Sequence, residues 1–218
     1  MTHSSHRFGT KEGLKKDFVV MAMASKGVND VGSGPKIKEH LTICAEHNPV
    51  NLGGMKVGNL CNQTKEEIIA GAKDYVSTFN GVFCDRDTVR DVVKELIDKK
   101  VGLSTVISGV YTETKSIADE LGFVPHTVNF PLGIWGKKEL LPEPEILAIT
   151  TQCGHGMISQ HLVRYYMQRV ADGFDAHKAA KEVCRYCYCA IANLDRVERI
   201  LKEGAAKLNH EEVKESAV

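Results

Sequence analysis

The chain has 218 residues, of which 43% are hydrophobic and 26% charged, so it can form a well-packed core and is not a disordered protein. Its 28 basic and 28 acidic side chains balance, which argues against nucleic acid or an anionic membrane surface as a partner. No apolar run approaches the roughly 20 residues needed to span a bilayer, and the first residues lack the apolar stretch of a secretory signal. We therefore expect a cytoplasmic protein.

The first half of the chain is predicted to alternate between helices and strands. Residues 14–24 are strongly apolar, and their Met and Ala content favours a buried helix over a strand. A Gly-rich turn, "GSGPK", opens onto a helix with Pro35 in its first turn, and we interpret this turn as structural. The residues "TKEE", Thr64 to Glu67, have the form of a capping box and predict a third helix.

A strand–helix–strand–helix pattern follows between residues 80 and 123. Residues 80–85 and 101–110 are short apolar strands, and residues 85–100 form an amphipathic helix between them. This spacing predicts parallel strands joined by right-handed crossovers. Residues 124–130 could add a further strand carrying His126 and Asn129, which would face opposite sides of it.

From residue 142 onward the pattern is entirely helical. Pro144 can start one helix, and apolar residues predict a second over residues 157–173. Asp175 and Asn193 can cap two more. The predicted fold class is therefore α/β, with a parallel βαβ-type lobe over residues 1–136 and an all-helical lobe over residues 137–218 that carries the main cysteine cluster.

Three of the seven cysteines, Cys184, Cys187 and Cys189, fall within the segment "VCRYCYCA". Cys184 and Cys187 share a helix face, but Cys187 and Cys189 are two residues apart and would point about 200° away from each other on a helix. The three thiols can converge only if the helix ends inside the motif, at about Cys187. A fourth thiol, Cys153, lies in the Gly-bracketed segment "TQCGHGM" at another predicted helix end.

Four thiolates from two helix ends would suit either of two metal centres. A cubane [4Fe–4S] cluster accepts four cysteines, and zinc accepts four cysteines or three cysteines and a histidine. We expect the cluster, because zinc sites usually contain two CxxC turns and this chain has one. Neighbouring tyrosines would form an apolar pocket, and Arg185 would offset the charge of the thiolates.

Two readings without a metal stay open. Free cysteine often behaves as a small buried hydrophobe, which is how we interpret Cys44 and Cys84, while Cys61 is ambiguous. A redox dithiol at Cys184 and Cys187 is the least favoured reading, because such pairs occupy helix N-termini, where the helix dipole lowers the thiol pKa.

The segment "CGHGMIS" is expected to open a helix, and the amides of Gly154 and Gly156 could then bind an anion. His155 is a candidate ligand or general acid–base group, or alternatively a turn residue. Ser159, in the first turn, is expected to hydrogen-bond the backbone rather than to act as a nucleophile.

These residues predict an iron–sulfur protein of anaerobic metabolism, with Cys153, Cys184, Cys187 and Cys189 holding a [4Fe–4S] cluster. It would serve a redox partner or act as a Lewis-acid enzyme on a small anionic substrate, and in the second case only three thiolates would bind. The alternatives are a zinc-stabilised binding or scaffold module, and a metal-free enzyme that uses Cys153 or His155. The chain could form a homo-oligomer, although no sequence feature requires one.

Overall fold

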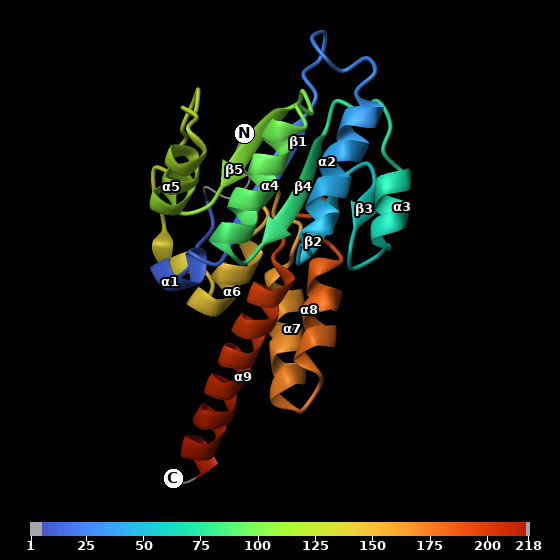
Figure 1. The fold of residues 1–218 in the computed structure, drawn as a ribbon. Helices are drawn as coiled ribbons and strands as arrows, with labels where there is room; N and C mark the ends of the chain where they lie inside the picture. Colours follow the sequence, from blue (N-terminus) through green and yellow to red (C-terminus); the bar gives the residue numbers. More distant parts are fainter. Residues whose placement is uncertain (1–5, 217–218) are drawn as a thin grey trace.

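The computed structural model describes residues 6–216 and contains a five-stranded sheet with helices packed on both of its faces (Figure 1). The strand order is β3-β2-β4-β1-β5. The strands are β1 Phe18–Met23, β2 Asn51–Gly54, β3 Gly58–Asn59, β4 Thr78–Phe83 and β5 Ser104–Ser108. The helices are α1 Lys11–Leu14, α2 Gly34–Glu46, α3 Lys65–Ala70, α4 Arg86–Asp98, α5 Tyr111–Leu121, α6 Pro144–Thr150, α7 Gln160–Ala171, α8 Ala176–Cys184 and α9 Leu194–Ser216, with a 3₁₀ turn η1 at Lys138–Leu140.

The predicted parallel βαβ layout is wrong, because every neighbouring pair of strands in the sheet is antiparallel. Strands β4 and β5, which α4 connects, do run in the same direction, since both are antiparallel to β1. However, β1 lies between them. A crossover helix sets the direction of the next strand but leaves room for another strand to insert. The same arrangement, β1–α2–β2 around β4, gives two interleaved split βαβ units.

Strand β1 occupies the segment that was expected to be a helix, so that prediction is also wrong. Five of its six residues are buried, because the strand is central and both of its faces are covered. Phe18 and Val20 point into the core beneath α2 and α4, whereas Val19 and Met21 point into the core formed with the C-terminal helices. A strand covered on both faces lacks the polar–apolar alternation that identifies a half-exposed strand.

Three of the C-terminal helices, α6, α8 and α9, begin where the sequence predicts them. Pro144 lies in the first turn of α6, the Asp175 side chain accepts a hydrogen bond from the Lys178 amide, and the Asn193 side chain accepts one from the Arg196 amide. These helices pack against the sheet face that bears Val19, so one buried cluster includes side chains from both parts of the chain. Figure 1 shows α7, α8 and α9 lying together at one end of the sheet.

The segment that follows α5 is not a strand. Residues 124–130, which were expected to form one, are exposed and outside the sheet, so His126 and Asn129 lie on an exposed loop. Alternating apolar residues form a strand only where a neighbouring strand supplies hydrogen bonds, and this segment has none beside it. No helix within residues 6–216 combines the length and the apolar character that a membrane crossing requires.

Candidate metal centre

The cysteine motif is a turn that follows a helix. Helix α8 ends at Cys184, with Arg185 as its C-cap, and two tight turns follow, in which the Cys187 amide bonds the Cys184 carbonyl and the Ala190 amide bonds the Cys187 carbonyl. The helix therefore ends inside the motif, as convergence of its thiols would require, and it ends three residues earlier than expected. We call residues 185–192 the cysteine loop.

Three asparagines hold the cysteine loop against the sheet. The side-chain amide of Asn80 donates to the Cys189 carbonyl at 2.8 Å, and that of Asn59 donates to the Cys187 carbonyl at 3.2 Å. Asn51 donates to the carbonyl of Ala192 at 2.9 Å. All three asparagines are fully buried. The sequence analysis did not identify them. Asparagine is depleted in strands, so its presence there could have indicated a buried side chain with a hydrogen-bonding role.

Gly53 lets the cysteine loop lie directly on the sheet. It pairs with Asn59 on one side and Asn80 on the other, so it occupies the middle of the asparagine row. Its φ is +132°, and a β-carbon there would lie 2.0 Å from the Gly58 carbonyl oxygen and 3.3 Å from the Ala190 β-carbon. Only glycine fits at this position without moving the backbone.

The second half of the site is the loop between α6 and α7, residues 151–159, which brings Cys153 and His155 to the cysteine loop. The Cys153 and Cys189 sulfurs are 3.8 Å apart, and His155 Nδ1 lies 3.1 Å from the Cys189 sulfur and 3.8 Å from the Cys153 sulfur. These three atoms form a group within 4.8 Å that could hold a metal ion. Both cysteines are buried, and His155 is exposed on the solvent side.

Cys187 lies beside this group and interacts with Cys153, but its sulfur is not among the atoms that lie within 4.8 Å of one another. Its side chain hydrogen-bonds that of Cys153, and the backbone amides of Ile191 and Ala192 donate to its sulfur. The amide of His155 donates to the Cys153 sulfur in the same way. Amide hydrogen bonds of this kind stabilise a sulfur that carries negative charge.

The thiols share their protons unevenly. The pKa of Cys153 is lowered well below its usual range, first because of its hydrogen bonds with the Cys187 and Cys189 thiols. The pKa values of Cys187 and Cys189 are raised, first because of the same hydrogen bonds with Cys153 and then because of burial. Cys153 is therefore the first of the three thiols to ionise.

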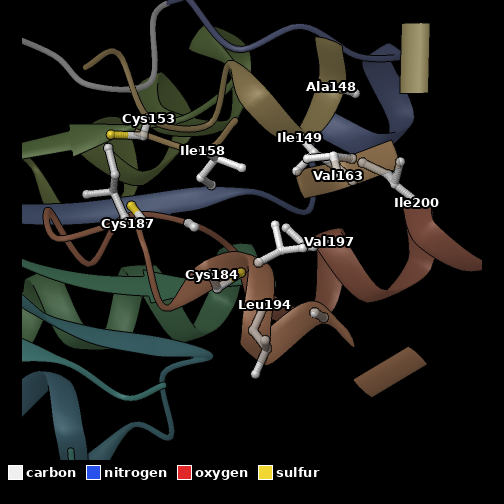
Figure 2. Close-up of a cluster of buried hydrophobic side chains, with 14 of the residues drawn as sticks. Ala148, Ile149, Cys153, Ile158, Val163, Cys184, Cys187, Leu194, Val197 and Ile200 are labelled. Atoms are coloured by element: carbon white, nitrogen blue, oxygen red, sulfur yellow. The ribbon is translucent and has the colours of Figure 1, made fainter. Parts of the chain in front are cut away.

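Cys184, the fourth predicted ligand, is at the end of α8 and pairs with a different thiol. Its side chain hydrogen-bonds Cys61, on the loop between β3 and α3, and this bond raises the pKa of Cys184 and lowers that of Cys61. Figure 2 shows Cys184 at the end of its helix, with Cys153 and Cys187 together on another side of the buried cluster. The role of Cys184 as a ligand stays a prediction.

The glycines beside His155 do not open a helix. Helix α7 begins at Gln160, and Ser159 caps it by accepting from the His161 amide at 3.2 Å, as expected for that serine. The Gly156 amide donates to the Cys153 carbonyl at 3.1 Å. The expected helix start at residue 157 is wrong, and anion binding by Gly154 and Gly156 stays a prediction without the helix dipole that motivated it.

His6 covers the Gly154 side of the site. A β-carbon on Gly154 would lie 2.5 Å from Cε1 of His6, so the imidazole packs directly on the bare α-carbon. Burial and the nearby charge of Arg7 lower the pKa of His6. Two imidazoles, those of His6 and His155, therefore flank the thiol group, and no motif linked His6 to it.

The predicted role of Arg185 is only partly reflected in its contacts. Its guanidinium pairs with Glu182 at 3.0 Å on the surface. Its backbone carbonyl accepts hydrogen bonds from the side chains of Asn62 and Asn59. Charge compensation by Arg185 stays a prediction.

A buried ionic network underlies the cysteine loop. The Asp17 carboxylate accepts hydrogen bonds from Arg7 and from Arg196, the latter at 2.6 Å, and all three side chains are nearly inaccessible to solvent. Arg7 also donates to the Ile191 carbonyl in the cysteine loop. The network contains two guanidiniums and one carboxylate, and Arg7 connects it to the cysteine loop.

The remaining two cysteines lie away from the site. Cys44 is fully buried on α2, 3.7 Å from Nε2 of His40, as expected for a small core residue. Cys84 is half-buried beside Asn193, and burial is the main cause that raises its pKa to about 11.

Comparison with protein-family models, curated proteins and solved structures found no match to this chain.

Proposed function

We propose that this chain is a metalloprotein in which Cys153, Cys187, Cys189 and His155 hold one zinc-type ion. The observation that carries the proposal is the 3.8 Å distance between the Cys153 and Cys189 sulfurs. A tetrahedral ion with metal–sulfur bonds of about 2.3 Å separates its sulfur ligands by about 3.8 Å. The donor set of three sulfurs and one imidazole is one that zinc accepts.

The burial of the donors supports a Lewis-acid enzyme acting on a small substrate. A zinc ion can polarise a substrate carbonyl, and it lowers the pKa of a water molecule bound to it. The thiols are buried, whereas His155 is exposed, so a substrate would approach from the His155 side. His155 would either bind the ion on its solvent-exposed side or leave the ion and act as a general acid–base group for the substrate.

A [4Fe–4S] cluster is the second candidate, and the number of neighbouring thiols favours it. Cys61 and Cys184 are hydrogen-bonded to each other, and the charge of Cys187 acts on Cys184, so five thiols lie in one region. A cluster held by Cys153, Cys187 and Cys189, with Cys184 as fourth ligand or one iron left open, would act in electron transfer or as a Lewis acid. A reducing cytoplasm would keep all of these thiols available to a metal.

The test is metal analysis and absorbance of protein purified without oxygen. One zinc per chain and no colour would support the proposal, whereas four irons per chain and a broad absorbance band at about 400 nm would support the cluster. The variants Cys189→Ser and His155→Ala should lose most of the metal. Cys84→Ser, a half-buried thiol outside the group, is the control and should retain it.

Wild-type protein that holds neither metal, even after zinc or iron and sulfide are supplied, would contradict both candidates. Activity lost on alkylation of Cys153 in such metal-free protein would then favour a thiol enzyme without a metal.

A further inference from the structure

Residues 124–141, here called the arm, expose a concentration of large apolar side chains. Val124, Leu132 and Trp135 are 92%, 87% and 82% exposed. Eight large apolar side chains of the arm are at least 40% exposed: Val124, Val128, Phe130, Leu132, Ile134, Trp135, Leu140 and Leu141. Single exposed apolar residues are common, but a contiguous group of this size marks a surface that binds another molecule.

Apart from η1 the arm has no helix or strand, and it stands out from the body of the molecule beside α5 (Figure 1). Among residues 6–216, no backbone hydrogen bond joins residues 124–135 to other backbone groups. The contacts of its aromatic side chains are local: the Phe130 ring meets the Tyr111 ring edge-on at 5.0 Å, and the Trp135 indole donates to the Leu132 carbonyl at 2.9 Å. The arm therefore offers both apolar side chains and free backbone groups to a partner.

An apolar groove of about 370 Å³ lies at the base of the same arm. Leu96 of α4, Ile107 of β5 and Phe123, the last residue before the arm, are among the residues that line it. Strand β5 is the end strand of the sheet, and its outer edge pairs with no strand in the described part of the chain. Such an edge can accept an extended segment.

We propose that the arm exchanges between two copies of this chain, so that each arm docks on the groove and the β5 edge of the other copy. The chain carries both halves of this interface, and they adjoin at Phe123 and Val124. With a two-fold axis close to the bases of the arms, each arm would occupy the groove of the other copy. No arm or groove would then remain open to a third copy, which gives a closed dimer. Eight large apolar side chains amount to on the order of 800 Å² per copy, the area that stable dimers bury.

The experiment measures the mass of the full chain in solution over a range of concentrations, together with the emission of its only tryptophan, Trp135. We expect twice the mass of one chain and blue-shifted emission, because docking removes the indole from water. Leu132→Asp on the arm and Thr105→Arg at the exposed edge of β5 should each halve the mass and shift the emission to the red. Both positions are exposed, so neither substitution should unfold the monomer.

The matched control is Val31→Asp, since Val31 is 90% exposed but lies on the loop before α2. It should leave both the mass and the emission unchanged. A wild-type mass of one chain at high concentration would overturn the proposal, as would an open-ended series of larger species. A dimer that survives both Leu132→Asp and Thr105→Arg would also overturn it. Metal content has no part in these readouts, so the result is independent of the proposed metal centre.

Discussion

At the scale of single residues, the candidate site depends on buried amides as much as on thiols. Asn80 shows why: its side chain donates to the carbonyl of Cys189 and therefore sets the direction of that residue's backbone. The cysteine spacing was enough to predict that the helix must end within the motif. It could not reveal Asn80, because the sheet register that places Asn80 beneath Cys189 is set by strands more than a hundred residues earlier.

Replacing Asn80 with Ala tests this role. The change leaves the buried Cys189 carbonyl without a partner, which should destabilise the protein by about 1–3 kcal/mol. It should also weaken zinc binding about 10–100-fold, the typical cost of losing a residue that orients a metal ligand. Urea unfolding and a zinc competition assay measure the two effects. The control is Asn62→Ala, which removes an exposed amide from the Arg185 carbonyl and should cost less than about 1 kcal/mol. Equal losses for the two variants would contradict a special role for Asn80.

The uneven pKa values of the thiols predict how zinc affinity depends on pH. The raised pKa values of Cys187 and Cys189 favour their protonated form near neutral pH, whereas the lowered pKa of Cys153 favours its thiolate. Zinc must displace the two remaining protons, so affinity should rise with pH by up to about 100-fold per unit and level off only above the raised pKa values. A competition titration between about pH 6 and pH 8 measures this slope. Cys189→Ser should reduce the slope to about tenfold per unit, and an affinity that does not change with pH would contradict thiolate ligation.

At the scale of elements, helix ends and caps were predictable because their signals are local. Thr64 and Glu67 form the reciprocal capping box that the sequence "TKEE" indicates, and Asn193 caps α9 as expected. Strand β1 was not predictable in this way. A central strand buried on both faces has no alternation of polar and apolar residues, so its composition alone suggested a helix. The error in β1 also produced the error in sheet topology, since the strand that separates β4 from β5 was missing.

At the scale of the whole molecule, the Asp17 network joins the N-terminal segment, β1, the cysteine loop and α9. Because Asp17 is the carboxylate between two buried guanidiniums, Asp17→Asn should destabilise the protein by about 3–5 kcal/mol. Urea unfolding measures the loss. Asp119→Asn, which breaks the exposed pair with Lys115 on α5, is the control and should cost at most about 1 kcal/mol. A small loss for Asp17→Asn would mean that this network does not hold the parts of the chain together.

The asparagine row beneath the cysteine loop has a consequence for how the proposed metal ion would bind. The carbonyls of Cys187, Cys189 and Ala192 are bonded to the sheet, so the path of the loop is set by protein groups rather than by the ion. Small zinc-finger domains differ, because they fold only when the metal binds. In this chain the binding site would already be formed in the folded protein before an ion binds. Which metal occupies it in a cell would then depend on the supply of each metal as well as on the donor set.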